Sequence, residues 1–239
     1  MSTANSHLSV RGIPIEVVYK DIKNLHIGVY PPAGRVRIAA PARLDDERVR
    51  LAVIHRLSWI KRQRRQFQDA ARQTPREMVP GESHYVWGKR LRLKVIERPG
   101  RPHVEVDGDR LLLYMPVGSD QAARTRTLQQ WQRSEMRRAV PPLIEQWEPA
   151  VGRCVPQWGI RRMKTKWGSC NCETGRILIN LELAKKHPHS LEYVVVHEMA
   201  HLLERNHGDR FAKLMDSLMG DWRTRRDALN AAPLADEAW

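Results

Sequence analysis

The stretch VVVHEMAHLLERNH, residues 194–207, places three histidines and two glutamates within fourteen positions. The apolar residues around it recur at helical spacing, and Ser190 stands where a helix N-cap is expected. The sequence therefore predicts a helix from Ser190. His197 and His201 lie one turn apart on it, so both imidazoles point from one face and reach a single ion. The apolar stripe consists of Leu191, Val194, Val195, Met199 and Leu202.

Glu198 follows the first histidine and points to the side of the pair, where it can touch a metal-bound water without being a ligand. The His-Glu-x-x-His pattern specifies this arrangement of two histidine ligands on one helix face with an acid beside them. Asn206 and Gly208 tolerate a left-handed turn at a helix end, which predicts that the chain returns His207 over the metal. Three acidic residues compete with His207 as third ligand: Glu204, Asp209 and Asp216.

Three protein ligands with one open position are typical of catalytic zinc, whereas a structural site is closed by four ligands. The sequence thus predicts one Zn²⁺ per chain, bound by His197, His201 and His207. Zinc lowers the pKa of its bound water and polarises a carbonyl group, while Glu198 takes the proton and passes it to the leaving amine. Peptide hydrolysis suits such a site. The alternative is a solvent-facing helix that happens to be rich in histidine.

Residues 161–183, immediately upstream, alternate as a hairpin with its turn at 173–175. An exposed edge strand beside the helix would pair with an extended substrate, and residues 166–169 or 177–181 are the two candidates. The equal alternative is that both strands are internal to the sheet. Cys170 and Cys172 point to one side of a regular strand. With Cys154 and a histidine they could form a second, structural metal site, although idle thiols are the simpler interpretation.

The N-terminal half alternates short β-rich runs with helical segments. Its turns and strands predict small antiparallel sheets, and an amphipathic helix is expected over 44–73. A second long helix begins after Ser119, and Pro141 and Pro142 should kink or break it. The fold class is α+β. The chain is expected to consist of a β-rich region with a basic helix (1–118) and a catalytic region (119–239), either as separate domains or as one integrated domain. No repeat at a solenoid period is visible.

The chain carries a net charge of +14, and the surplus is uneven. From Arg153 onward there are 14 Lys and Arg against 11 Asp and Glu, so +11 lies in the first two thirds. Such a surface attracts polyanions, of which nucleic acid is the commonest, although a merely solvated basic surface is an equal alternative.

Three cysteines, two of them only two positions apart, favour a reducing compartment. The first twenty residues lack the charged start and apolar core of a signal peptide, and no apolar run is long enough to span a bilayer. We expect a cytoplasmic protein without membrane contact.

The stretch WGSCNCETGRILINLELAKKHPHSLEYVVVHEMAHLLERNHGDRF, residues 167–211, resembles the YgjP-like metallopeptidases, which are zincins similar to the SprT and WLM proteases. The most specific parts are the run 167–170, Asn180 and the three histidines. The resemblance implies a zincin-like fold, three histidine ligands, Glu198 as general base and a protein or peptide substrate. It also nominates Trp167, Ser169 and Asn180 for substrate binding.

Three functional hypotheses follow. The leading one is a zinc metallopeptidase, in a sharper form a protease acting on proteins held at DNA. In that form the phosphate contacts come from Lys61, Arg62, Arg64 and Arg65. The second is a metal-dependent enzyme that hydrolyses nucleotide phosphoanhydrides. Against it, the sequence has no glycine-rich phosphate loop and no carboxylate cluster that would hold Mg²⁺. The third is a DNA- or partner-binding module with a structural metal or latent site, against which the intact Glu198 argues.

Overall fold

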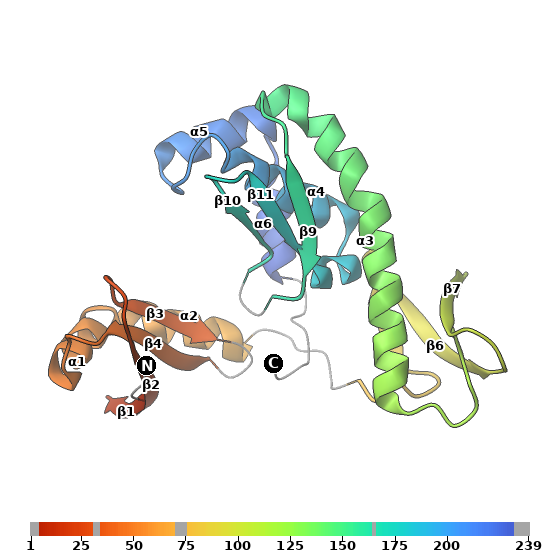
Figure 1. Ribbon diagram of the computed structural model, residues 1–239, viewed down its shortest axis with the longest axis horizontal. Helices are drawn as coiled ribbons and strands as arrows, with labels where there is room; N and C mark the ends of the chain where they lie inside the picture. Colours follow the sequence, from red (N-terminus) through yellow and green to blue (C-terminus); the bar gives the residue numbers. More distant parts are fainter. Residues whose placement is uncertain (1–4, 31–33, 70–75, 164–165, 232–239) are drawn as a thin grey trace. The chain divides into compact units, whose positions relative to one another are not determined.

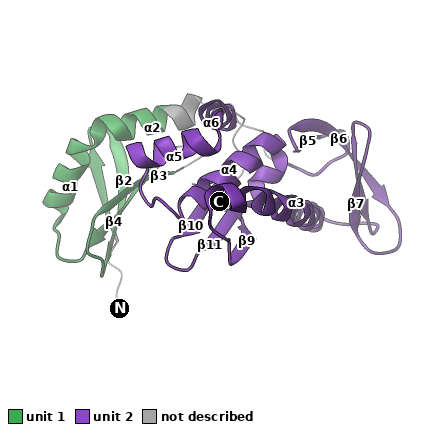
Figure 2. Ribbon diagram, turned by 90° about the horizontal axis from the view of Figure 1, so that it is seen from above, with its two compact units in different colours: residues 1–73, 234–239 green, residues 74–233 purple. Residues whose placement is uncertain are grey.

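The computed structural model describes residues 5–30, 34–69, 76–163 and 166–231 of the chain (Figure 1). The chain forms two compact units: unit 1 comprises residues 1–73 with 234–239, and unit 2 comprises residues 74–233 (Figure 2). The division predicted after residue 118 falls inside unit 2.

Unit 1 is a four-stranded sheet packed against two helices. Apolar residues alternate along the inner strands, so Ile15, Val17 and Ile38 are buried beneath Val49 and Val53 of the first helix. The strand order is β1-β2-β4-β3. The elements are β1 (Asn5–Val10), β2 (Ile13–Lys20), β3 (His26–Tyr30), β4 (Arg35–Pro41), α1 (Asp46–His55) and α2 (Leu57–Asp69).

The helix predicted over 44–73 is divided into α1 and α2, and its last four predicted residues lie outside the described part of the chain. The division falls at Arg56, whose backbone N–H donates to the Val53 carbonyl at 3.1 Å, three residues back. This tighter turn replaces one α-helical step. The sequence pattern could not reveal it, because Val53 and Ile60 on either side are both buried and keep an apolar spacing.

Unit 2 begins with a second four-stranded sheet, of order β5-β6-β8-β7, followed by the long helix α3. The turn between its first two strands donates two backbone hydrogen bonds to a 3₁₀ helix near the histidine segment, from Trp87 N to Ala184 O (2.9 Å) and from Gly88 N to Lys185 O (3.3 Å). These bonds join the sheet to the rest of unit 2. The elements are β5 (Ser83–Val86), β6 (Lys89–Glu97), β7 (His103–Asp107), β8 (Arg110–Met115) and α3 (Gln121–Val151).

The two four-stranded sheets share one topology. In each, the second and fourth strands pair in parallel and the third strand lies at an edge. Each first hairpin turns through two residues with positive φ, 47° and 76° at Arg11–Gly12 and 48° and 80° at Trp87–Gly88. Each following helix is capped by an aspartate, Asp45 or Asp120. The similarity of the two blocks lies in topology and turn geometry, and is hardly visible in the residue letters.

The prediction of small sheets is confirmed, but the prediction that they are antiparallel is wrong. Every sheet is mixed and contains one parallel pair: β2 with β4, β6 with β8, and β9 with β11. The reason is that each parallel pair joins strands that are not consecutive in the chain. Alternation of apolar residues identifies a strand but leaves its direction open.

Helix α3 continues through the prolines that were expected to kink or break it, and Figure 1 shows it curving along its length. Pro141 and Pro142 cannot donate to the carbonyls of Arg137 and Arg138, four residues back. Both arginines are exposed, so water can satisfy these carbonyls. Val140 and Ile144 on the same turns are buried in the core of unit 2, which stabilises the helix through packing.

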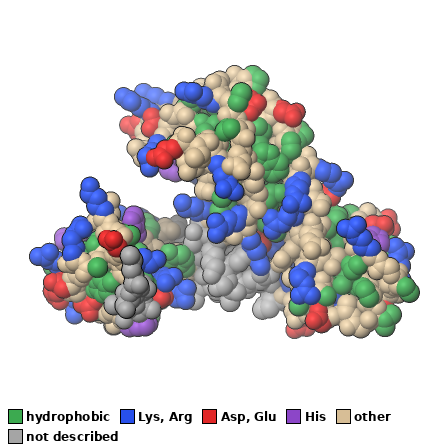
Figure 3. Space-filling view, viewed as in Figure 1, with side chains coloured by type: hydrophobic (Ala, Val, Ile, Leu, Met, Phe, Trp, Pro, Cys, Tyr) green, Lys and Arg blue, Asp and Glu red, His purple; other side chains and the backbone are tan. Residues whose placement is uncertain are grey.

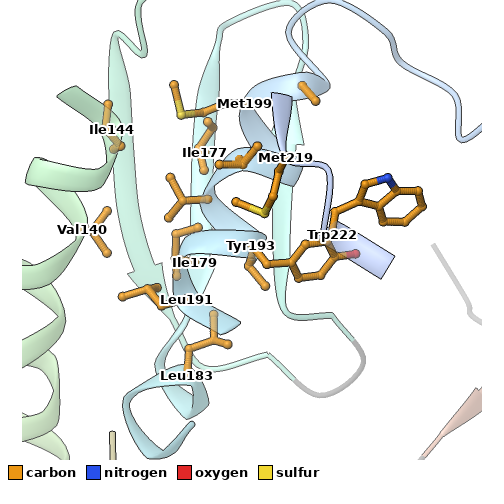
Figure 4. Close-up of a cluster of buried hydrophobic side chains, with 14 of the residues drawn as sticks. Val140, Ile144, Ile177, Ile179, Leu183, Leu191, Tyr193, Met199, Met219 and Trp222 are labelled. Carbon is orange, nitrogen blue, oxygen red and sulfur yellow. The ribbon is translucent and has the colours of Figure 1, made fainter. Parts of the chain in front are cut away.

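The remaining part of unit 2 builds the surroundings of the histidine helix α4. A three-stranded sheet of order β10-β11-β9 covers this helix, and α3, α5 and α6 complete the core. Figure 4 shows Ile177 and Ile179 of the central strand packed with Leu191 and Met199 of α4. The elements are β9 (Gln157–Arg161), β10 (Gly168–Asn171), β11 (Arg176–Asn180), η1 (Leu181–Lys185), α4 (Pro188–Ala200), α5 (Asp209–Leu218) and α6 (Trp222–Ala231).

The hairpin predicted over 161–183 is confirmed as β10 and β11, with Gly175 at the turn. Of the two candidate edge strands, 177–181 is excluded because β11 is the central strand. The other candidate, 166–169, overlaps β10, which is an edge. Lys and Arg side chains are spread over both units on the face drawn in Figure 3. Within the described ranges, no helix has both the length and the apolar character that crossing a bilayer requires.

Candidate metal centre

Helix α4 carries two of the three histidines and is buried on almost every side. It begins at Pro188 and not at Ser190 as predicted, because proline is favoured at the first helical position and the preceding residue, His187, provides the cap. The His187 Nδ1 accepts a hydrogen bond from His189 N at 3.2 Å. Ser190 lies buried in the first turn. The core fixes the helix on its apolar sides and leaves one face turned to a cavity.

The chain leaves α4 without the left-handed turn expected at Asn206 or Gly208. The last turn tightens instead, with Leu203 N donating to Ala200 O at 3.0 Å. Gly208 has a φ of −92° and begins α5 as its N-cap. His207 nevertheless returns to the end of α4, as the sequence predicted.

The structure brings the Nε2 atoms of three histidines together. Those of His197 and His207 lie 2.9 Å apart, and those of His201 and His207 lie 3.1 Å apart. Donors bound to one zinc ion at 2.0–2.1 Å in tetrahedral geometry are separated by about 3.3 Å. The three imidazoles therefore fit a single metal ion with small adjustments. In the described part of the chain this is the one group of three or more potential ligands.

The predicted acidic competitors for the third ligand position do not join this group. Asp216 accepts a hydrogen bond from Trp222 Nε1 at 2.8 Å and pairs with Arg223. Glu204 contributes its backbone, since its carbonyl oxygen lies 3.0 Å from His201 Nδ1. That contact fixes the proton on Nδ1 and leaves Nε2 with a free lone pair, which is how proteins orient a ligating histidine.

Phe211 of α5 forms an apolar floor beneath the three rings, a role that the sequence did not reveal. Its ring centroid lies 4.6 Å from that of His201, 4.8 Å from that of His207 and 4.9 Å from that of His197. Only 3% of Phe211 is exposed. The only sequence signal for it is a phenylalanine four residues after the last histidine.

Burial and the neighbouring rings favour the neutral form of His197 and His207. Burial lowers the pKa of His197 to about 3, with further contributions from His201 and His207. Burial, followed by the charge of His201, also lowers the pKa of His207. Neutral imidazole is the form that binds metal, so this environment favours ligation over protonation.

Glu198 lies on the same helix and is 5% exposed. Burial raises the pKa of its carboxyl group to about 8, and Lys166 acts in the opposite direction. Strand β10 passes against it at Gly168. A Cβ atom on that glycine would lie 2.5 Å from Glu198 Oε1 and 2.6 Å from its Cγ. Glycine is therefore the residue that lets β10 approach the carboxylate this closely.

A cavity of about 720 Å³ opens over the three histidines and Glu198. Strand β10 forms one wall, and Trp167 and Ser169, both nominated for substrate binding, lie along it. Tyr193 and Val194 of α4 also line it. The cavity therefore combines an edge strand, an aromatic lining and a potential metal site.

Asn180, also nominated for substrate binding, is not among the residues that line this cavity and is 3% exposed. Its Nδ2 donates to the carbonyls of Met163 (2.9 Å) and Lys166 (2.7 Å), and its Oδ1 accepts from Glu182 N at 3.2 Å. The contacts of Nδ2 fix the backbone of Met163 and Lys166, which precede β10. The structure therefore points to a positioning role for Asn180.

The cysteines are free thiols. Cys170 lines the cavity, and burial raises the pKa of its thiol to about 12. Cys154 and Cys172 are exposed. Among the described residues no group of three metal ligands includes a cysteine, so the alternative of a second metal site gains no support.

The four basic residues nominated for nucleic-acid contacts lie on α2 of unit 1. Lys61, Arg62 and Arg65 are exposed. Arg64 differs, because its backbone and side chain pack against Gly34, where a Cβ atom would lie 3.0 Å from its Cγ. Three of the four are thus available to a partner.

A comparison with protein-family models matches residues 24–232 to the YgjP-like metallopeptidase domain. The chain belongs to the YgjP-like metallopeptidase family. The match confirms the resemblance noted at residues 167–211 and extends it over most of the chain. Membership in this family supports a metal-dependent peptidase that acts on protein or peptide substrates.

One solved structure, the metallopeptidase zymogen abylysin of Pyrococcus abyssi, is similar at 21% sequence identity. The alignment covers 38% of this chain and 90% of that one, with a TM-score of 0.35. A comparison with curated proteins finds no match.

Proposed function

We propose that this YgjP-like metallopeptidase is a zinc-dependent hydrolase of peptide bonds. The observation that carries the proposal is the convergence of three histidine Nε2 atoms, within 4.8 Å of one another, in the cavity that also contains Glu198. His197, His201 and His207 would hold the ion, one per chain. Imidazole ligands suit zinc, and three of them leave a position open for catalysis.

A zinc ion held there would act as a Lewis acid that acidifies water and polarises the substrate carbonyl group. The protein residues do the rest. Glu198 would accept the proton of the attacking water and deliver it to the leaving amine. Gly168 would keep the carboxylate in place by allowing β10 to lie against it, and Phe211 would exclude water from beneath the histidines.

Strand β10 is suited to hold an extended substrate. Asn180 N donates to Trp167 O at 2.9 Å, so this pair is a hydrogen-bonded one that continues the ladder of β10 and β11. Hydrogen-bonded and non-hydrogen-bonded pairs alternate along an antiparallel ladder, so the backbone groups of Gly168 and Cys170 do not bond to β11. Their backbone N–H and C=O groups point away from β11 and toward the open edge, where a peptide backbone would add as a further strand.

The decisive experiment compares wild type with Glu198→Gln. The variant should retain zinc and the far-UV circular dichroism spectrum, yet lose peptide hydrolysis by about 10²- to 10⁴-fold, the usual contribution of a general base. Glu145→Gln, an exposed position on α3, is the matched control and should behave like wild type. Hydrolysis by Glu198→Gln at the wild-type rate would exclude the proposed role.

The alternative of nucleotide phosphoanhydride hydrolysis is tested by product analysis with nucleotides and with unfolded protein as substrates. We expect new peptide termini and no release of phosphate. No observation in the described residues favours the phosphoanhydride reaction, because the cavity acids are Glu173 and Glu198 alone.

A nucleic-acid partner, and with it the DNA-associated form of the protease, stays a prediction based on charge. The exposed residues Lys61, Arg62 and Arg65 on α2 are what a phosphate backbone would contact. Salt-dependent retention on DNA that is lost on charge reversal of these residues would support it. Retention that charge reversal leaves unchanged would remove it. A cytoplasmic location likewise stays a prediction from cysteine usage.

A further inference from the structure

Two cations line the metal cavity without a role in the proposed reaction. Lys166 precedes β10, and Arg205 lies in the loop between the ligands His201 and His207. Within the described ranges neither side chain has a hydrogen bond or an ion pair with an acidic residue. Most other cavity-lining residues are neutral, so these two charges face the substrate space.

The position of Lys166 is fixed by its surroundings. Asn180 Nδ2 holds its carbonyl at 2.7 Å, and the next residue, Trp167, lies 5.6 Å from the ammonium group of Lys186. The charge of Lys166 reaches both Glu198 and His207, since it acts on the pKa of each. An exposed lysine is ordinarily mobile, but this one begins from an anchored backbone at the cavity wall.

The cavity is electrically asymmetric along β10. Lys166 stands before the strand, and Glu173 stands after it at the hairpin turn. A peptide laid along β10 would therefore meet a cation at one end and an anion at the other.

We propose that the two cations of the metal cavity, Lys166 and Arg205, provide a carboxylate-binding subsite. Either cation can pair with a carboxylate of the peptide, which selects substrates with a carboxylate close to the scissile bond. This proposal rests on the proposed peptidase function. Ammonium and guanidinium groups form charge-assisted hydrogen bonds with carboxylates, and the guanidinium does so in a bidentate manner. The carboxylate has two possible sources, an acidic side chain or the C-terminus of the peptide.

The test uses the zinc-loaded full chain and peptide pairs of equal length. In the first arm, glutamate replaces glutamine at each position around the cleaved bond in peptides with amidated C-termini. In the second arm, a glutamine peptide carries either a free or an amidated C-terminus. We expect the kcat/KM of the preferred carboxylate-bearing member to exceed that of its partner by about 10- to 100-fold, the factor for a charge-assisted hydrogen bond. The arm in which kcat/KM differs by this factor shows whether the carboxylate comes from an acidic side chain or from the C-terminus.

The variants Lys166→Met and Arg205→Met should each reduce this ratio, and the double variant should bring it close to one. Lys166→Arg should restore part of it. Lys213→Met, an exposed lysine of α5 outside the cavity, should keep the wild-type ratio. Zinc content, measured for every variant, verifies an intact site.

Two results would overturn the subsite. One is equal kcat/KM for all members of both peptide arms in wild type, which would leave the peptidase function standing. The other is a loss of kcat in Lys166→Met that is the same for charged and neutral peptides, which would place the lysine at the reacting carbonyl instead. Absence of any hydrolysis by zinc-loaded wild type would count against the proposed function itself and is thus distinguishable.

Discussion

Helices α4 and α2 were both singled out by their sequences, one for its histidines and the other for its basic residues. The histidines of α4 converge on His207, whose Nε2 lies 2.9 Å from that of His197 and 3.1 Å from that of His201. The basic residues of α2 remain apart on an exposed surface, and Arg64 packs against Gly34. The first arrangement can bind one ion, whereas the second offers only a distributed charge.

The difference lies in what each function requires of the fold. A catalytic metal site needs ligands, base and substrate wall within a few ångströms, so other elements must supply partners to α4. Strand β10 contributes Gly168, and α5 contributes Phe211. Phosphate contacts need only accessible charge, which α2 provides without partners. Substitutions should therefore have large effects around α4 and small ones on α2.

Among the residues that pack around Glu198, the largest of these effects is expected for Gly168→Ala. The new methyl group would lie within 3 Å of Glu198 and displace its carboxylate. Since a misplacement of about 1 Å can cost about 100-fold in rate, kcat should fall by about 10- to 100-fold while zinc stays bound. Gly220→Ala is the control, because nothing lies within 4 Å of its Cβ position. Unchanged kcat in Gly168→Ala would show that the contact does not position Glu198.

An intermediate effect is expected for Asn180→Ala. The substitution leaves the partly buried carbonyls of residues 163 and 166 and the buried N–H of residue 182 without their side-chain partner. The free energy of unfolding should fall by about 1 to 3 kcal/mol, measured by chemical denaturation. Asn230→Ala on the exposed side of α6 should change it little. Wild-type stability in Asn180→Ala would contradict the anchoring role.

The smallest effect is expected for combined charge reversal on α2, Lys61→Glu, Arg62→Glu and Arg65→Glu. Hydrolysis of a short neutral peptide should keep its kcat/KM within about twofold, because exposed charges act mainly on association with charged partners. Steady-state kinetics at two salt concentrations provides the measurement. A tenfold loss for the neutral peptide would remove the contrast between the two helices.

The sequence predicted whatever depends on local spacing. The i, i+4 histidines, Glu198 between them and the hairpin before α4 all follow from helical or strand periodicity, and the structure places them accordingly. The sequence pattern places the start of α4 at Ser190, two residues too late, because Pro188 occupies the first helical position. The helix-breaking effect of Pro141 and Pro142 was overestimated, because packing of Val140 and Ile144 compensates.

Features that depend on distant residues could not be predicted. Gly168 and Glu198 are thirty positions apart, and only the packing of β10 on α4 reveals their contact. Asn180 seemed a substrate residue because of its place in the motif, yet its amide is used by backbone groups. The shared topology of the two four-stranded sheets was hidden because side-chain alternation does not record strand direction.

The most direct test of the account is the zinc content of protein purified without added metal, for wild type and His207→Ala. His189→Ala, an exposed histidine of α4 outside the site, is the control. The account predicts about one zinc ion per chain in wild type and control, and a sharp loss in His207→Ala. Folded wild type without stoichiometric zinc, or unchanged zinc in His207→Ala, would contradict the three-histidine centre.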